Sequence, residues 1–344
     1  MKYWGKRDEK LILPMNGSLS FTMDEQLKTR TSVLFSDKFA QDELWLNGNK
    51  MDLSDKETAE RMQQLDVIRA KAKTKAKAKI VSYNCFPTAA GFASSAAGLA
   101  ALACAASKAA GLNLSVQELS ILARLGSGSA CRSVVGGFAE WRKGEKADGS
   151  DSYAVQITSH THWPELRNVI AIVDAGKKKI SSRAGMKQTI ATSVLYPSRI
   201  AYLPKLIEDV KKSVLAKDFA KFGELIMRES SNMHAVMLDT WPPIMYLNDY
   251  SKQIMYSIHD YNASIGGIVA AYTFDAGPNA HIYTTESQVD SIKKILSEIE
   301  GVNKTMVCKV GAGPKYLDEG HLISEDGGVL QARFDENKRD LVVE

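Results

Sequence analysis

A glycine-containing loop followed by an alanine-rich segment is the first feature of the chain with the residue types for chemistry. Residues 86–95 read Phe-Pro-Thr-Ala-Ala-Gly-Phe-Ala-Ser-Ser, and small apolar residues continue to Ala110. A helix that opens from such a turn offers unpaired N–H donors and the positive end of its dipole, which together suit phosphate oxygens. No Lys-Ser or Lys-Thr pair closes the loop, so it is not a Walker A motif. The segment predicts another kind of phosphate cradle, or else a buried helix whose small residues permit close packing.

Hydroxyl and cationic side chains gather in three further segments. Residues 126–133 read Gly-Ser-Gly-Ser-Ala-Cys-Arg-Ser, and the guanidinium of Arg132 is a fork-shaped donor suited to phosphate or carboxylate. If a helix begins near Ser129, Arg132 lies about one turn along the same face. Residues 2–7 place three cations around two aromatic rings, and residues 177–186 combine lysines with hydroxyls and an arginine. A solvated terminus or surface loop is the alternative explanation for each segment.

Asp275 stands out as a single residue. It ends the strand-like run Ala-Ala-Tyr-Thr-Phe and is followed by Ala-Gly-Pro-Asn. Catalytic groups often lie where a rigid strand meets a turn, although aspartate followed by Gly-Pro is also common in turns without chemistry. The six histidines lack the spacing of metal ligands, and no Gly-x-Ser-x-Gly elbow is present. A zinc enzyme or serine hydrolase is therefore not expected.

These residues need both sheet and helix to position them. Alternation and turn residues predict an Asn47-Gly48 hairpin, and a glycine turn at 311–314 that closes the last strand. Strands are expected at 18–23, 27–33, 79–83, 169–173, 269–274, 281–284 and 306–310, and helical character at 55–73, 96–110, 186–233 and 289–299. The shift from mixed sheet to helix predicts a domain boundary near residue 180, and fading periodicity beyond Ile323 predicts a poorly ordered tail over 324–344.

Composition places the chain among soluble globular proteins. Its 344 residues favour two packed domains, and a net charge of +4 suits a polyanionic small molecule but not nucleic acid. The four cysteines are isolated in sequence, which favours a reducing compartment. The charged N-terminus lacks the apolar region of a secretory signal, and the longest apolar run is too short to cross a bilayer. We expect a cytoplasmic protein, with a peroxisome-like organelle as the alternative.

Taken in order, four motifs resemble the mevalonate diphosphate decarboxylase family. They are Lys-Tyr-Trp-Gly-Lys-Arg-Asp from residue 2, the loop from residue 86, Gly-Ser-Gly-Ser-Ala-Cys-Arg-Ser, and Tyr-Thr-Phe-Asp-Ala-Gly-Pro-Asn-Ala around Asp275. The resemblance runs from Lys2 to about Ile323. It implies the two-domain α+β fold of the galacto-, homoserine, mevalonate and phosphomevalonate kinase superfamily. The N-terminal half, 1–180, would resemble ribosomal protein S5 domain 2, the half at 181–323 would be ferredoxin-like, and the active site would lie in the cleft between them.

The resemblance implies ATP- and Mg²⁺-dependent conversion of mevalonate 5-diphosphate to isopentenyl diphosphate, ADP, phosphate and CO₂. This is a step of isoprenoid and sterol biosynthesis in the mevalonate pathway. A tertiary hydroxyl leaves poorly, so the family phosphorylates it first; loss of that phosphate then draws electrons from the carboxylate. The expected partners are this substrate and a second copy of the chain, with no nucleic acid or membrane.

By this family analogy, each motif receives a role. Asp275 would remove the hydroxyl proton, Lys2 would orient Asp275 and keep it ionised, and Ser95 with magnesium would align the transferred group. Arg132 would hold the substrate carboxylate. The nucleotide phosphates would be bound by Ala90, Gly91, Ala93, Ser94, Ser95 and Ala96, and the substrate by Tyr3, Lys6, Ser127, Ser129, Arg132, Ser182 and Arg183.

One departure from the family pattern opens alternatives. Members usually carry a strand with Ala-Pro and Asn-Ile-Ala directly before Lys-Tyr-Trp-Gly-Lys, whereas here only Met1 precedes it. We therefore expect the sheet to lack a strand, at a cost to stability or activity. Two other functions stay open: a kinase or decarboxylase of the same superfamily acting on another phosphorylated mevalonate, and a non-catalytic binding protein.

Overall fold

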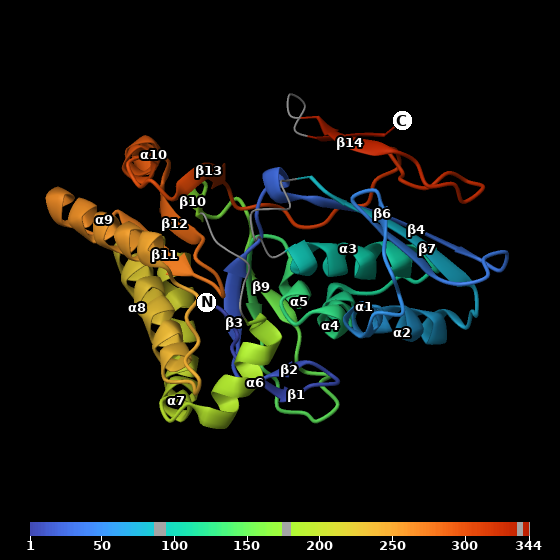
Figure 1. The fold of residues 1–344 in the computed structure, drawn as a ribbon, viewed down its shortest axis with the longest axis horizontal. Helices are drawn as coiled ribbons and strands as arrows, with labels where there is room; N and C mark the ends of the chain where they lie inside the picture. The colour runs from blue at the N-terminus through green and yellow to red at the C-terminus, as the bar shows by residue number, and fades with distance from the viewer. Residues whose placement is uncertain (86–93, 174–179, 336–339, 344) are drawn as a thin grey trace. The chain divides into compact units, whose positions relative to one another are not determined.

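The computed structural model describes residues 1–85, 94–173, 180–335 and 340–343, and it divides the chain into two compact units (Figure 1). Unit 1 comprises Met1–Arg7, Pro14–Phe21 and Ile157–Val310, and unit 2 comprises Asp8–Leu13, Thr22–Gln156 and Gly311–Glu344. Among the described residues, no helix is both long and apolar enough to span a membrane. The mixed α+β class and the organisation in two units confirm the predicted fold class.

Unit 1 is built on a four-stranded antiparallel sheet. Its strands are β10 (Leu166–Val173), β11 (Ala270–Phe274), β12 (Ala280–Thr285) and β13 (Val302–Cys308). Their order in the sheet is β11-β12-β10-β13, with helices inserted between β10 and β11 and between β12 and β13. This β-α-β-β-α-β connectivity is the ferredoxin-like arrangement. The expected ferredoxin-like half is thus present.

Five α-helices also lie among the described residues of unit 1. They are α6 (Ser182–Thr192), α7 (Tyr196–Ala216), α8 (Phe219–Leu238), α9 (Asp249–Ile265) and α10 (Val289–Ser297), the last preceded by the 3₁₀ turn η3 (Glu286–Gln288). Asp218 accepts a hydrogen bond from the Lys221 amide at the start of α8, and Gly266 ends α9 in the left-handed conformation. Helix α8 packs against β11 and against α7. The long predicted helical stretch is therefore three helices, which place α8 beside the strand that leads to Asp275.

Unit 2 contains a second sheet, ordered β4-β7-β5-β6. The strands are β4 (Thr29–Ser36), β5 (Glu43–Leu46), β6 (Asn49–Lys50) and β7 (Lys77–Asn84). Asn47 and Gly48 both have positive φ, as a tight hairpin turn requires, which confirms the predicted turn between β5 and β6. Strand β5 runs parallel to β7 and is connected to it by α1 (Lys56–Arg61) and α2 (Gln63–Ala72).

Helix α3 (Ser94–Ala109) packs on β4 and β7 and also contacts α4 (Val116–Gly126) and α5 (Ala130–Ser133). The predicted strand and the predicted helix that flank the glycine-containing segment are both present, because β7 ends at Asn84 and α3 begins at Ser94, whereas residues 86–93 lie outside the described residues. Short elements complete the chain: β1 (Lys6–Asp8), β2 (Leu13–Pro14), β3 (Ser18–Phe21), η1 (Glu25–Leu27), β8 (Phe138–Trp141) and β9 (Ala154–Thr158).

The C-terminal segment differs from the predicted tail. It forms the hairpin β14 (Ala332–Asp335) and β15 (Asp340–Val343), and Leu341 belongs to a buried cluster with Val81 and Tyr83 of β7. Asp340 also pairs with Lys28 at 3.0 Å and with Arg30 at 2.9 Å. This C-terminal hairpin is therefore stabilised by apolar contacts and ion pairs with residues from the first quarter of the chain, although its own hydrophobic periodicity is weak.

The units also divide the chain differently from the predicted boundary near residue 180. The chain passes from unit 2 to unit 1 between residues 156 and 157, before β10. It does so there because β10 pairs with β12 and β13 of unit 1. Two N-terminal segments, Met1–Arg7 and Pro14–Phe21, belong to unit 1 rather than to the N-terminal half. Consequently Lys2 and Asp275 belong to the same unit.

Candidate active site

Lys2 and Asp275 form an ion pair in unit 1. Asp275 follows directly after β11, and its Oδ2 lies 2.8 Å from Nζ of Lys2. The Lys2 side chain is 19% exposed and the Asp275 side chain 50% exposed. The carboxylate therefore has a fixed cationic partner and keeps a face accessible to a small molecule. The two residues that the resemblance linked are in direct contact.

Opposing effects set the pKa of Asp275. Desolvation by the surrounding protein raises the pKa, whereas the charge and hydrogen bond of Lys2, with a smaller contribution from His281, lower it to about 2. The attraction to the cation outweighs desolvation, so Asp275 is an ionised carboxylate throughout the neutral range. An ionised carboxylate on a rigid strand end can accept a proton from a hydroxyl group placed beside it.

Two histidines in the neighbourhood of Asp275 stay neutral. Burial lowers the pKa of His234, on α8, to about 4, and burial likewise lowers the pKa of His281, on β12. The His234 ring packs edge-on against Phe274 with centroids 6.4 Å apart. His281 Nδ1 lies 3.0 Å from Nδ2 of Asn168. No group of three or more His, Cys, Asp or Glu side chains within the described ranges is placed to hold a metal ion.

The aromatic segment after Lys2 is a packed part of unit 1 rather than a solvated terminus. Tyr3 is 7% exposed and Trp4 is fully buried. Gly5 has φ +109°, and a Cβ atom there would lie 2.0 Å from the Tyr196 hydroxyl oxygen. The glycine of the Lys-Tyr-Trp-Gly-Lys motif is thus required by both its backbone conformation and its close approach to Tyr196.

The other predicted substrate ligands of unit 1 lie at element ends. Ser182 and Arg183 open α6, where Ser181 accepts a hydrogen bond from the Ala184 amide at 3.2 Å, and both are half-buried. Lys6 begins β1 and is also half-buried. Positive side chains and a helix N-terminus therefore occur in the same unit as Asp275, which favours binding of an anion.

The predicted phosphate cradle belongs to unit 2. Ala90, Gly91 and Ala93 lie outside the described residues. Ser94 and Ser95 form the first turn of α3, whose length from Ser94 to Ala109 gives a full helix dipole, and Ala96 is buried. Of the Gly/Ala/Ser motif, the part that the structure describes is a helix N-terminus directly after the glycine loop, as the sequence predicted.

The Gly-Ser-Gly-Ser segment forms the junction between α4 and α5, also in unit 2. Ser127 ends α4 and Ser129 precedes α5, and their hydroxyl oxygens lie 3.4 Å apart. Arg132 lies within α5 and is half-buried, and α5 packs on α3. A short helix does begin after Ser129, which confirms the local geometry expected for Arg132.

The late glycine turn is structural. The Gly137 amide donates to the Gly311 carbonyl at 2.9 Å, and the Gly311 amide donates to the Thr22 carbonyl at 2.7 Å. A Cβ atom on Gly311 would lie 2.2 Å from the Met23 carbonyl oxygen, and one on Gly136 would lie 1.9 Å from that of Ala312. Backbones approach too closely here for any side chain, so the turn joins segments of unit 2.

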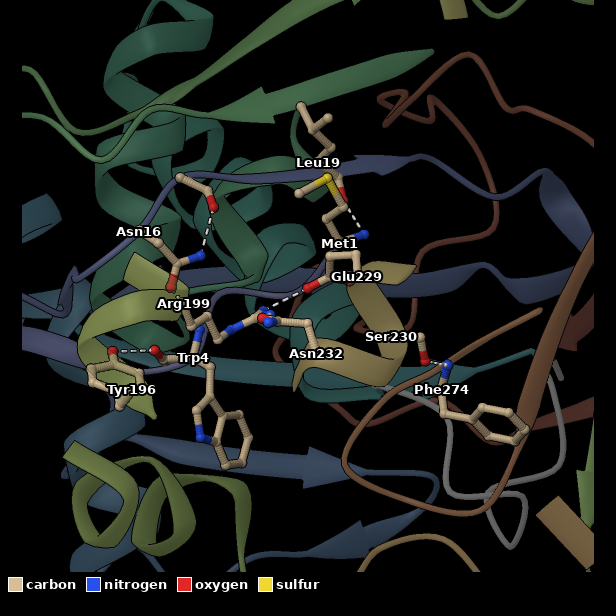
Figure 2. Close-up of polar contacts among 11 residues, drawn as sticks. Met1, Trp4, Asn16, Leu19, Tyr196, Arg199, Glu229, Ser230, Asn232 and Phe274 are labelled. Carbon is tan, nitrogen blue, oxygen red and sulfur yellow. Dashed lines mark hydrogen bonds and ion pairs between the residues drawn. The ribbon is translucent and has the colours of Figure 1, made fainter. Parts of the chain in front are cut away.

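Sequence reasoning missed a buried polar network on α7 and α8 (Figure 2). Arg199 Nη2 lies 2.5 Å from Glu229 Oε1, and both side chains are essentially inaccessible. Nη1 of Arg199 also donates to Asn232 Oδ1 at 2.6 Å, while the Tyr196 hydroxyl donates to the Trp4 carbonyl at 2.5 Å. The available signal was the position of Arg199 on the apolar stripe of α7, with Leu203 and Leu206, where a solvated arginine does not belong.

Comparisons with known proteins cover nearly the whole chain. Residues 1–154 match the family model of the diphosphomevalonate decarboxylase-like N-terminal domain, and residues 168–309 match that of the mevalonate 5-diphosphate decarboxylase C-terminal domain. Diphosphomevalonate decarboxylase from Candida albicans is 44% identical, over 93% of this chain and 95% of its own length.

Two solved structures extend these comparisons to the fold. Mevalonate diphosphate decarboxylase from Trypanosoma brucei is 35% identical with a TM-score of 0.84, covering 92% of this chain and 94% of its own. The structure of MDDEF in complex with MVAPP, AMPPCP and magnesium is 39% identical with a TM-score of 0.83, covering 91% and 93%. Sequence and fold thus agree along both units.

Proposed function

The chain belongs to the diphosphomevalonate decarboxylase family, and we propose that Lys2 and Asp275 carry out the proton transfer of an ATP-dependent decarboxylation of mevalonate 5-diphosphate. In this reaction the tertiary hydroxyl oxygen takes the terminal phosphoryl group of ATP and ADP leaves. The bond from carbon to the new phosphate then breaks, the bond to the carboxylate supplies the electrons of the double bond, and CO₂ departs. The products are isopentenyl diphosphate, ADP, phosphate and CO₂.

The 2.8 Å ion pair between Lys2 and Asp275 is the observation that carries this proposal. Because Asp275 is ionised in the neutral range, it can take the hydroxyl proton as the oxygen attacks phosphorus. Lys2 orients the carboxylate and is a positive charge close to a trianionic substrate. A positioned base of this kind typically contributes ~10² to 10⁴ in rate.

The residues of unit 2 suit the nucleotide and the substrate anions. Backbone N–H groups at the start of α3, with Ser94, Ser95 and Ala96, would hold nucleotide phosphates, and Arg132 with Ser127 and Ser129 would hold the substrate. ATP supplies the phosphoryl group, and Mg²⁺ neutralises charge on its phosphates when bound. The related MDDEF structure holds MVAPP, AMPPCP and magnesium.

Product stoichiometry tests the proposed reaction. Purified protein is mixed with ATP, Mg²⁺ and mevalonate 5-diphosphate, and ADP, inorganic phosphate and CO₂ are measured on the same sample. We expect the three products in equal amounts. ADP without CO₂ would instead identify a kinase of the superfamily that stops after phosphorylation, and a folded sample that forms no ADP would indicate a binding protein.

Substrate preference is tested in parallel. Mevalonate, its 5-phosphate and its 5-diphosphate are compared at equal concentrations, with CO₂ as the readout. We expect the diphosphate to give the highest kcat/KM, because each charged partner left unpaired in a closed site costs binding energy. A higher kcat/KM for the monophosphate would assign the chain to another decarboxylase of the superfamily.

We further propose that the chain pairs as a homodimer in the cytoplasm and serves sterol biosynthesis. Exposed apolar side chains on two loops of unit 1 support a dimer. The loops are joined by a hydrogen bond from the Leu195 amide to Asp239 at 2.9 Å, and the exposed side chains are Val194, Leu195, Trp241 and Met245. The four buried free thiols suit a reducing compartment. Sedimentation tests the dimer: the wild type should have the mass of a dimer, and Trp241→Ser should have the mass of a monomer. Cell fractionation tests the location: we expect the protein in the cytoplasmic fraction, and recovery with a peroxisome-like organelle is the alternative.

A further inference from the structure

We infer that Tyr196, Arg199, Glu229 and Ser230 are positioning residues that set the geometry of the Lys2–Asp275 pair through α7 and α8. The inference rests on the proposed function of that pair. Lys2 and Asp275 belong to distant parts of the chain, and each is only one or two residues from a backbone group fixed by these helices. The two helices therefore act as a brace between the segment that carries the cation and the segment that carries the carboxylate. Figure 2 shows the contacts of Tyr196, Arg199, Glu229 and Ser230 that make up this brace.

Tyr196 fixes the segment that carries Lys2. Its buried hydroxyl donates to the Trp4 carbonyl oxygen at 2.5 Å. Gly5 passes so close to the same hydroxyl that a Cβ atom would lie 2.0 Å from it. On the other side, the Trp4 amide donates to Asn16 Oδ1 at 3.1 Å. The backbone two residues after Lys2 is thus held from both sides, with Tyr196 as its contact to α7.

Arg199 and Glu229 lock α7 to α8. The pair is 2.5 Å apart, with side-chain exposures of 0% and 1%. Asn232, one turn further along α8, accepts a second hydrogen bond from Arg199 at 2.6 Å. A buried charge tolerates little displacement, because any shift leaves it without its partner in a medium of low dielectric constant. Tyr196 precedes Arg199 by one turn, so the lock also fixes the phenol ring.

Ser230 completes the brace on the side of Asp275. Its hydroxyl oxygen accepts a hydrogen bond from the Phe274 amide at 3.0 Å, in a buried contact. Phe274 is the residue before Asp275, and Ser230 is the residue after Glu229. The ion pair between the helices and the bond that fixes the end of β11 therefore come from adjacent residues of α8. Movement of α8 would shift the carboxylate and the helix lock together.

The pKa of Asp275 reports the integrity of this arrangement. The groups that act on the carboxylate come from every element around it: Lys2 and the Met1 amino group, His281 from β12, His234 from α8, and Tyr246 from the segment before α9. Both imidazoles are neutral, because burial lowers the pKa of each, and burial raises the pKa of Tyr246 to about 12. Lys2 is thus the main cation opposing desolvation, and a displaced Lys2 leaves the pKa of Asp275 raised.

The test uses Tyr196→Phe, which removes the hydroxyl and keeps the ring. The Asp275 carboxyl is followed by ¹³C NMR in protein labelled at aspartate Cγ and is assigned with Asp275→Asn. We expect the titration midpoint of Asp275 to rise by about one pH unit or more. Lys2→Met, which removes the cation itself, serves as the reference and should raise the midpoint in the same direction. In the steady state, kcat should fall about tenfold while the KM for ATP is unchanged, because the acid–base geometry is lost and nucleotide binding is not.

Matched variants decide between positioning and general stability. Tyr202→Phe, which alters an exposed tyrosine of the same helix, should leave the midpoint and kcat at wild-type values. Ser230→Ala, at the other end of the brace, should raise the midpoint as Tyr196→Phe does. A lowered Tm with an unchanged midpoint in both Tyr196→Phe and Ser230→Ala would overturn the inference. The NMR readout needs no turnover, so a wild-type protein that releases no CO₂ would refute the proposed function without deciding the role of the brace.

Discussion

The Lys2–Asp275 pair and the start of α3 are built in opposite ways. The pair joins side chains that are far apart in the sequence, and we infer that it depends on contacts of α7 and α8 that neither motif contains. The start of α3 belongs to one continuous sequence motif, and the first turn of the helix carries its own backbone N–H donors. The geometry of a local motif is determined by its own neighbouring residues. The geometry of a pair of residues distant in sequence, such as Lys2 and Asp275, is determined by the packing around them.

The difference has an energetic side as well. Phosphate binding at a helix N-terminus uses backbone groups that point correctly whenever the helix forms. The carboxylate of Asp275 depends on one cation 2.8 Å away, and its pKa follows that cation. Small displacements should therefore affect the convergent pair more than the helix terminus, and substitutions can separate the two regions.

Asp275→Asn should give the largest effect and separate chemistry from nucleotide binding. Because an amide cannot take the hydroxyl proton, we expect kcat to fall by ~10² to 10⁴. Nucleotide affinity, which the start of α3 would provide, should stay close to wild type. Single-turnover kinetics and titration with a labelled ATP analogue measure the two quantities.

The matched control is Asp249→Asn, which alters an exposed carboxylate in the first turn of α9 and should keep the wild-type rate. Near-normal turnover by Asp275→Asn would remove it from the role of base and end the contrast between the two regions.

Arg199→Met should have the next largest effect, on stability. The substitution leaves Glu229 buried without its cation, and breaking a buried pair in this way costs about 3–5 kcal/mol. Replacing both partners, in Arg199→Met with Glu229→Leu, removes the unpaired charge and should recover most of that loss. Urea unfolding of the wild type, Arg199→Met, Glu229→Leu and the double variant gives the four free energies of unfolding of this double-mutant cycle. If the double variant were as unstable as Arg199→Met, an uncompensated Glu229 charge would not be the cause.

Sequence reasoning succeeded where a few neighbouring residues determine the structure. The Asn47-Gly48 turn needs only its own two positive φ angles, and the start of α3 needs only the loop before it. Burial along β12 alternates residue by residue, so the side of that strand that faces the core can be predicted from its own sequence. These features explain why the α+β class and most elements could be predicted before any contact was known.

The parts that sequence reasoning missed depend on distant partners. The position of Arg199 on the apolar stripe of α7 indicates burial, but nothing near it in the sequence indicates that Glu229 will neutralise it. The hairpin at 332–343 likewise gains its stability from β7 and from Lys28 and Arg30, not from its own pattern. The proximity of Lys2 to Asp275 was expected only through the family resemblance.

Lowering the pH should weaken unit 1 through His234, an effect of intermediate size. The pKa of His234 is about 4 in the folded protein, below its ordinary value of 6.5, so the unfolded chain binds the proton first. Stability from this group is complete above pH 6.5 and is lost as the pH falls toward 4. Between pH 7 and pH 5 the loss is about 2 kcal/mol.

Urea unfolding at both pH values, compared with His234→Gln, isolates this contribution from that of the carboxylates. The variant should lose less stability than the wild type over the same interval. Equal losses in the two proteins would mean that His234 is not the group responsible.

Glu208→Gln should have the smallest effect and calibrates the Arg199 result. Glu208 and Lys211 form a 2.9 Å pair on the solvent side of α7, with Glu208 58% exposed. Solvent screening limits such a pair to about 0.5 kcal/mol or less in the free energy of unfolding. A loss comparable with that of Arg199→Met would show that burial is not what distinguishes the two ion pairs of this helix.

The division of the chain between the two units has a consequence for biosynthesis. Met1–Arg7 and Pro14–Phe21 are translated well before their partners in unit 1, which extend from Ile157 to Val310. The segment with Lys2 and the fully buried Trp4 cannot pack until most of these partners have been translated. Unit 2 also waits, since it includes Gly311–Glu344. Neither unit can therefore finish folding until most of this sequence has been translated, and the early segments stay exposed in the meantime.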